Sequence, residues 1–164
     1  MKRLIGLAIA LILFSSASIL AMHKPMQKPV FDINQLDEPA RQAFARLMAA
    51  EAFAIGPVGF AARTSEAETA FRTLLADAHA VEAFHQLIAD AKPEGQAYGL
   101  LGLYIKDRKG FEQEAARVRD ASPEKRVQVM SGCVVMPEGM NELIGKFAFY
   151  AANLSSSRSR RVDQ

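Results

Sequence analysis

The sequence has only one cysteine, Cys133, so an internal disulfide is excluded and the fold must rest on its hydrophobic core. It also lacks the HExxH, CxxC and Asp-x-Asp spacings that commonly hold metal ions, and the Gly-Lys-Ser/Thr element of a P-loop. No metal ligands, cofactor-binding residues or catalytic residues are therefore predicted, and no cofactor is expected. The strong patterns in this chain are patterns of packing.

A secretory signal peptide is predicted at residues 1–21. The basic start Met1–Arg3 precedes an eleven-residue apolar run, Leu4–Phe14, and a stretch rich in small residues that ends at Ala21. Cleavage is expected after Ala21, with cleavage after Ala17 and a retained N-terminal anchor as the alternatives. The pattern predicts an exported protein that is periplasmic or extracellular.

The charge balance argues against nucleic acid as a partner. Removing Lys2 and Arg3 with the signal peptide leaves 18 basic and 18 acidic residues, so the mature chain has no net charge. Nucleic-acid binding needs a basic stripe on the folded domain. A membrane span needs about 20 apolar residues, which the run Leu4–Phe14 does not reach, so no span is expected after cleavage.

The rest of the chain is predicted to form one domain. Half of its residues are hydrophobic, which is enough for a core at this length. Residues 22–36, with two prolines and little periodicity, are predicted to be an extended linker. Residues 37–153 are predicted to be a single helical domain, and residues 154–164 a disordered basic tail.

The segment Gly95–Lys106 is predicted to be the central helix. Its apolar side chains point in nearly every direction at 100° per residue, and a helix that is apolar all round is buried on all sides. Gly95, Gly99 and Gly102 share one face at i, i+4 and i+7. Because glycine costs about 1 kcal/mol in a helix interior, three on one face indicate that another backbone comes close there.

The fold class is predicted to be mainly α, a stack of about six short amphipathic helices. Asp37 and Asp107 are expected to cap the first and fifth helices, and Ser65 with Glu68 to form a capping box for the second. The first helix is expected to reach about Phe53. The remaining helices are predicted near residues 81–91, 95–106 and 140–151. A repeat with an offset of 13 residues allows HEAT-like packing, although alanine-rich amphipathic helices also resemble one another.

A small β-hairpin is predicted near residues 127–136. Valines lie on both sides of Ser131-Gly132, which is read as a two-residue link between strands. A short helix from Ser122 to Gly132 is the alternative, because Ser-Pro-Glu is also a helix start.

Cys133 is the one candidate nucleophile, with His85 or His79 as its base. The favoured reading is an inert thiol buried among apolar neighbours, and an intermolecular disulfide is a further alternative.

Two other polar features have both a functional and a purely structural interpretation. Gly56-Pro57-Val58-Gly59 with Arg63 could cradle an anion, but a plain turn is favoured. A set of carboxylates is expected on solvated outer helix faces: Glu66, Glu68, Asp77, Glu82 and Asp90.

Several segments together resemble an uncharacterised family of exported bacterial proteins. The segments are Gly56-Pro57-Val58-Gly59-Phe60, Ala70-Phe71 with Leu74-Leu75, Ala97-Tyr98-Gly99-Leu100-Leu101-Gly102-Leu103-Tyr104, and Ser131-Gly132-Cys133. They span roughly residues 44–147. Many such proteins are lipoproteins, but this chain lacks the cysteine after the apolar run, so that property is not carried over. The resemblance implies a mostly helical exported domain and no catalytic residues.

These observations favour a non-enzymatic exported protein, periplasmic or envelope-associated, that acts by binding an unknown protein or envelope partner through its helical surface. The alternative is a thiol-dependent enzyme or hydrolase that uses Cys133 with His85 or His79.

Overall fold

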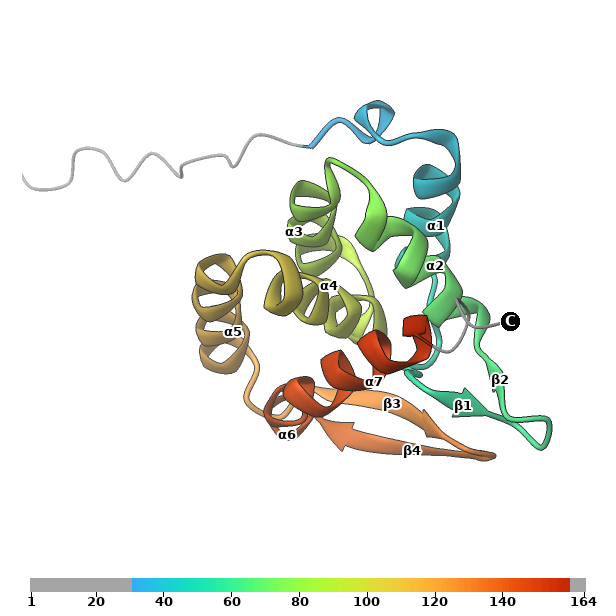
Figure 1. Cartoon of the computed structure of the whole chain (residues 1–164). Coiled ribbons are helices and arrows are strands. Elements are labelled where there is room, and N and C mark those ends of the chain that lie inside the picture. Colours follow the sequence, from blue (N-terminus) through green and yellow to red (C-terminus); the bar gives the residue numbers. More distant parts are fainter. Residues whose placement is uncertain (1–30, 160–164) are drawn as a thin grey trace, which may run out of the picture. The chain divides into compact units, whose positions relative to one another are not determined.

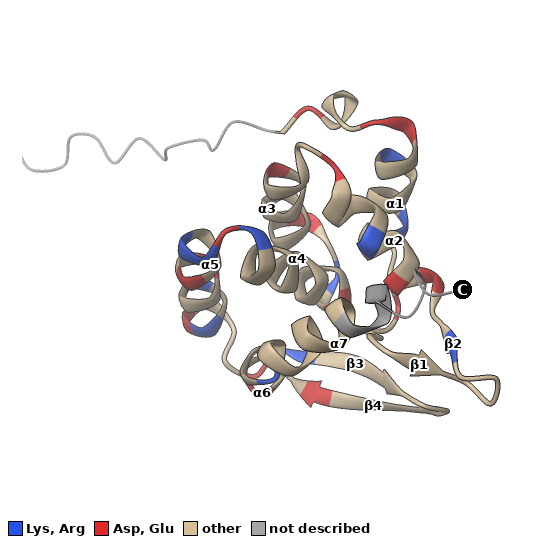
Figure 2. Ribbon diagram, viewed as in Figure 1, with Lys and Arg blue, Asp and Glu red and all other residues tan. Residues whose placement is uncertain are grey.

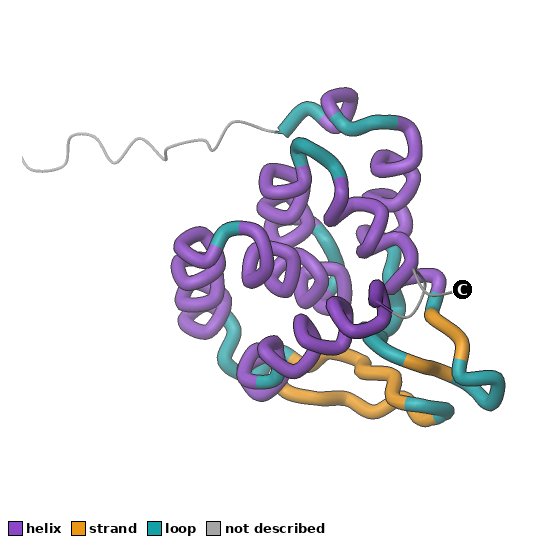
Figure 3. The backbone as a smooth tube through the Cα atoms, viewed as in Figure 1, coloured by secondary structure: helices purple, strands orange, loops and turns teal. Residues whose placement is uncertain are grey.

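The computed structural model describes the backbone of residues 31–159 and the side chains of residues 31–155. The predicted signal peptide, the predicted linker up to Val30 and residues 160–164 lie outside this part. The described residues form one compact unit. Its elements, shown in Figures 1 and 3, are the 3-10 helix Ile33–Gln35, α1 Glu38–Met48, β1 Pro57–Val58, β2 Arg63–Thr64, α2 Glu66–Ala76, α3 Ala80–Asp90, α4 Pro93–Lys106, α5 Arg108–Ala121, β3 Arg126–Ser131, β4 Val134–Gly139, α6 Met140–Gly145 and α7 Phe147–Ser159.

The mainly helical fold class is confirmed, and α4 is the central helix. It packs against α1, α3, α5, α6 and α7, and its residues Ala97–Leu103 are all buried. The glycine face meets other backbones as predicted. A methyl group on Gly95 would lie 2.5 Å from the carbonyl oxygen of Leu47, and one on Gly99 would lie 2.8 Å from that of Phe84. Gly102 leaves room for the Phe84 ring.

The predicted N-caps of the helices are also confirmed. The side chain of Asp37 accepts a hydrogen bond from Ala40 N, Ser65 Oγ accepts one from Glu68 N, and Asp107 accepts one from Gly110 N. Each satisfies a backbone donor that the first helical turn leaves without a partner. These three contacts fix where α1, α2 and α5 begin.

The first helix is shorter than predicted, because it ends at Met48 and not near Phe53. Phe53 forms a parallel bridge with β3 instead. Its N–H donates to Gln128 O at 2.7 Å, and its C=O accepts from Met130 N at 2.8 Å. The bridge places the Phe53 ring in the core, 4.8 Å from the ring of Tyr98 between centroids.

Tyr98 anchors this part of the core through its hydroxyl group. The hydroxyl accepts a hydrogen bond from Ala54 N at 2.8 Å and donates one to Ala54 O. Burial raises the pKa of Tyr98 well above its usual range, although the contact with the Ala54 backbone opposes this. The phenol therefore stays neutral and keeps both bonds to the loop after α1.

The predicted sixth helix is two helices, and the predicted disordered tail begins too early. The chain breaks at Lys146 between α6 and α7, and α7 continues to Ser159. Leu154 is buried, and its carbonyl oxygen accepts a hydrogen bond from Arg72 at 3.0 Å. Residues 154–159 are therefore helical, because Leu154 has a core to pack against and its carbonyl oxygen has a partly buried donor, Arg72. The linker predicted at residues 22–36 extends too far along the chain. Residues Ile33–Gln35 form the 3-10 helix, and Leu36 next to it is buried.

The hairpin near 127–136 is confirmed, and the alternative helix from Ser122 to Gly132 is wrong. Strands β3 and β4 pair antiparallel, but Ser131 pairs with Val134, so the two-residue turn is Gly132-Cys133 and not Ser131-Gly132. Gly132 has φ +57°, which suits the first central position of such a turn. A second short pair, β1 with β2, was not predicted.

No described helix is both long enough and apolar enough to cross a bilayer.

Candidate interaction surface at the hairpin tips

The expectation that Cys133 is buried is wrong, because the cysteine is exposed in the turn between β3 and β4. The error has a structural reason. Its apolar neighbours Val134 and Val135 lie on an edge strand and are 54% and 49% exposed, so they provide no apolar cover. Apolar residues on this strand are not buried, because no further layer of the described fold covers β4.

The structure joins His85 to a carboxylate and not to the thiol. His85 Nδ1 lies 3.1 Å from Glu114 Oε1, which links α3 to α5, while Cys133 lies at the tip of the β3–β4 hairpin on the other side of the described domain (Figure 1). His79 is the residue just before α3. A thiol nucleophile needs a base within hydrogen-bond reach, so the enzyme hypothesis would require these elements to move.

Glu68 is not on a solvated face as predicted, because only 2% of it is exposed. One carboxylate oxygen accepts hydrogen bonds from Arg72 at 2.6 and 2.8 Å, and the other accepts one from Gly56 N at 2.7 Å. Glu68 and Arg72 thus form an ion pair between successive turns of α2. The reciprocal half of the capping box is replaced by the bond to Gly56, which ties α2 to the start of the β1–β2 hairpin.

Two further buried carboxylates have similar structural roles. Glu94 Oε1 accepts a hydrogen bond from Gln128 N at 2.9 Å and so connects α4 to β3. Glu114 contacts both His85 and Arg117. Within residues 31–155, no group of three or more His, Cys, Asp or Glu side chains is placed to hold a metal ion.

The anion cradle considered at Gly56–Gly59 is a turn whose amides already have partners. Gly56 N donates to Glu68, and Gly59 N donates to Gly132 O at 2.9 Å. The second bond, together with a bridge between Val58 and Gly132, holds the two hairpins side by side. We call residues 57–64 and 131–137 the hairpin tips.

Most of the strongly exposed apolar side chains gather on the hairpin tips. Phe60 is 102% exposed, so nothing in the described fold packs against it, and Met136 is 61% exposed beside Val134 and Val135. Outside the tips, the other large exposed apolar residues in the described part are Ile105 on α4 and Phe149 on α7. Such clustering marks an interaction surface more often than single exposed residues do.

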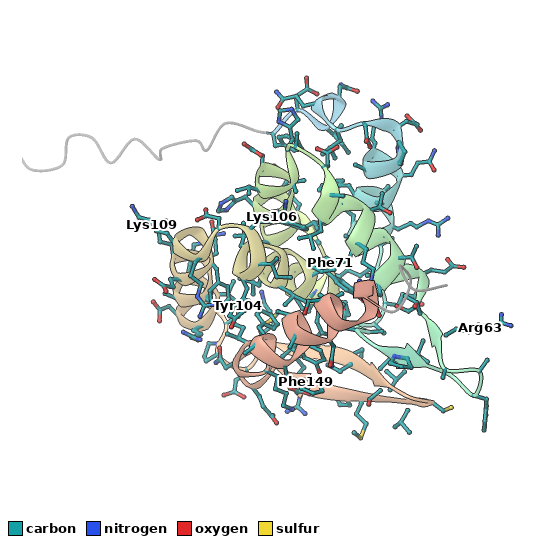
Figure 4. The ribbon with its side chains drawn as sticks, in the orientation of Figure 1. Arg63, Phe71, Tyr104, Lys106, Lys109 and Phe149 are labelled. Carbon is teal, nitrogen blue, oxygen red and sulfur yellow. The ribbon has the colours of Figure 1, made fainter. Side chains whose placement is uncertain are left out.

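The hairpin tips carry a single charged residue, Arg63. Figure 2 shows the two tips almost free of basic and acidic residues, in contrast to α5. The Arg63 side chain extends away from β2 into solvent, as labelled in Figure 4. The nearest acid on β4 is Glu138 at the far end of the strand, where Lys146 Nζ lies 2.9 Å from its carboxylate and the hydrogen bond raises the pKa of Lys146.

The outer edge of β4 offers few backbone groups to a partner. Gln128 and Met130 point their backbone groups toward Phe53, so the residues opposite them, Pro137 and Val135, point theirs away from β3. Pro137 has no N–H, and its carbonyl oxygen already accepts a hydrogen bond from Arg126 at 2.9 Å. Proline at an exposed edge is a common obstacle to further strand pairing.

The chain matches no family model, no curated protein and no solved structure. The resemblance to exported bacterial proteins and the HEAT-like packing therefore stay predictions. The sequence reasoning missed Phe60 as a candidate site residue. The signal was present, because Gly-Pro-Val-Gly followed by a large aromatic residue places that residue in a turn, where a core is rarely within reach.

Proposed function

We propose that this chain is a non-enzymatic exported protein that acts by binding an envelope component through its hairpin tips. The proposal rests on four exposed apolar residues of the hairpin tips: Phe60, Val134, Val135 and Met136. The two hairpins are hydrogen-bonded to each other, and their tips contain only one charged residue. Removing exposed apolar side chains from water is favourable, and several of them gathered on neighbouring elements are typical of a binding surface.

The surface differs from the one that the sequence predicted. The outer faces of the helices carry mostly charged and small residues, whereas the exposed apolar residues lie mainly in the strands and turns of the hairpins. The proposed partner is still an unknown protein or envelope component, as expected from the sequence. The proposed contact surface is now the hairpin tips and not the helices. Export rests on the predicted signal peptide and on the resemblance to exported bacterial proteins.

Site-specific photocrosslinking tests the proposal. A photoreactive amino acid replaces Phe60 or Val135 in the chain produced in its native host, and replaces Gln113 on exposed α5 as the matched control. We expect adducts with an envelope component from positions 60 and 135 and none from position 113. Adducts that are equally frequent at all three positions, or absent from positions 60 and 135, would contradict the proposed function.

Export is tested separately by mass spectrometry of the protein from its native host. We expect a species whose first residue is Met22. An intact Met1 on a protein recovered from the cytoplasm would contradict it.

A further inference from the structure

We propose that the envelope component is the surface of an anionic lipid bilayer, into which the hairpin tips insert. The inference rests on the proposed function and identifies the partner at the same surface. It differs from a membrane span, because only the tips would enter the interface while the helical domain stays outside it.

The side chain of Phe60 projects fully into solvent. At 102% exposure it has no pocket of its own and makes no contact that would hold it against the domain. A protein partner would need a matching pocket for this ring, since binding energy at protein interfaces concentrates in well-packed pockets. The interface of a bilayer needs none, and phenylalanine is among the apolar residues that surface-bound protein segments bury there. A projecting phenylalanine on one hairpin, with exposed valines on the adjoining hairpin, therefore fits a lipid surface better than a shaped one.

The charge of the tips has the sign that an anionic surface attracts. Arg63 is their only charged residue, and neither tip contains Asp or Glu. Lipid headgroups of the phosphatidylglycerol type attract a basic residue near the surface and repel an acidic one. The mature chain has no net charge, so the attraction arises from this local asymmetry and not from the charge of the whole domain.

Part of the backbone of the tips also suits an environment that is poor in water. An amide with no hydrogen-bond partner is costly in such surroundings. Here Gly59 N donates to Gly132 O at 2.9 Å, and Ala62 N donates to Gly59 O at 3.2 Å. Thus two turn amides next to Phe60 have partners within the protein before any insertion takes place.

Strand addition by a protein partner is less well supported by the same surface. It would need a row of free donors and acceptors along β4, but Pro137 lacks the N–H and its carbonyl oxygen is engaged by Arg126. Val135 is then the one central residue of the β4 edge that offers both groups outward.

Vesicle flotation with the chain starting at Met22 tests the inference. This chain should fold without the preceding residues, because the described residues, which begin at Phe31, form one compact unit. Vesicles of phosphatidylcholine are compared with vesicles that also contain phosphatidylglycerol. We expect binding to the anionic vesicles that weakens as salt is raised.

Three variants locate the contact. Phe60→Gln should lower the partition coefficient about tenfold or more, since the ring is the most exposed of the apolar side chains of the tips. Arg63→Gln should lower it about fivefold on anionic vesicles, with little effect on neutral ones. Phe149→Gln is the matched control, an exposed phenylalanine on α7, and should bind like the unchanged chain. Because Phe60 packs against nothing, its replacement should not disturb the fold, and circular dichroism checks this.

Failure of the inference can be told apart from failure of the proposed function. If the unchanged chain does not float with either vesicle, the lipid surface is ruled out as the partner. If Phe60→Gln floats as well as the unchanged chain, insertion of the hairpin tips is ruled out. Photocrosslinking from position 60 to a protein would then leave the proposed function standing with a protein as the partner. No flotation together with no adducts would overturn both.

Discussion

Replacing Gly99 with alanine tests the packing around the central helix. The added methyl group would lie 2.8 Å from Phe84 O, 2.8 Å from Ile88 Cγ1 and 3.2 Å from Leu87 Cβ. Favourable contacts between carbon atoms are about 3.5–4.0 Å, so helices α3 and α4 would have to move apart. The side chain of Ile88 can adjust, but Phe84 O belongs to the backbone of α3 and cannot rotate aside.

Two opposing terms set the size of the effect. Overpacking costs about 1–3 kcal/mol, and a backbone contact places Gly99→Ala in the upper half of that range. Alanine recovers about 1 kcal/mol through its higher helix propensity. The net loss in the free energy of unfolding should be about 1–2 kcal/mol, which for a domain of this size lowers Tm by about 3–8 °C.

Thermal and urea unfolding, followed by far-UV circular dichroism, measure this change. The control is Gly145→Ala at the end of α6, where an added methyl group would meet nothing within 4 Å. That variant should be unchanged or slightly stabilised, because it gains the helix propensity without a clash. A Gly99→Ala chain that melts within a degree or two of the unchanged chain would show that α3 and α4 are not in close contact there.

Three further predictions concern single side chains. Cys133 should react with a small thiol reagent about as fast in the folded as in the denatured chain, and Cys133→Ser should leave stability unchanged; slow labelling of the folded chain would mean that the turn is covered. Burial raises the pKa of Tyr98, so above about pH 10 the unfolded chain loses a proton that the folded chain keeps, and stability should fall as pH rises. Tyr98→Phe should flatten that decline while costing about 1–2 kcal/mol near neutral pH through the lost bonds to Ala54, and an equally steep decline in both chains would contradict this. Glu68→Ala should cost about 2–4 kcal/mol in urea unfolding, because it leaves Gly56 N and the partly buried Arg72 without this carboxylate, and a loss under 1 kcal/mol would show the tie to be unimportant.

The features that the sequence predicted well are local. Asp37, Ser65 and Asp107 cap the helices that follow them, because an N-cap depends only on the next three residues. The glycine face of α4 was also predictable, since an all-apolar helix with aligned glycines leaves few other arrangements. The sequence could not show which helices would pack against that face, because this depends on contacts between residues that are far apart in the chain.

The features that were predicted wrongly depend on distant parts of the chain. Phe53 leaves the first helix because β3 lies beside it, and Glu68 is buried because Gly56 needs an acceptor there. Leu154 is ordered because Arg72 of α2 reaches its carbonyl oxygen. The exposure of Cys133 and of the valines after it could not be inferred from their apolarity, since an apolar strand is buried only where another layer covers it.

The fluorescence of a single tryptophan at the tip tests the central claim, that the hairpin tips are the binding surface. The chain has no tryptophan, so Phe60→Trp introduces a reporter whose emission is not overlaid by others. Envelope membranes from the native host are titrated into the Phe60→Trp chain and into a Phe149→Trp control. The account predicts that emission of the first chain shifts to shorter wavelength as the indole leaves water, and that the control stays unchanged. Emission that remains at the water-exposed position throughout, or shifts equally in both chains, would contradict it.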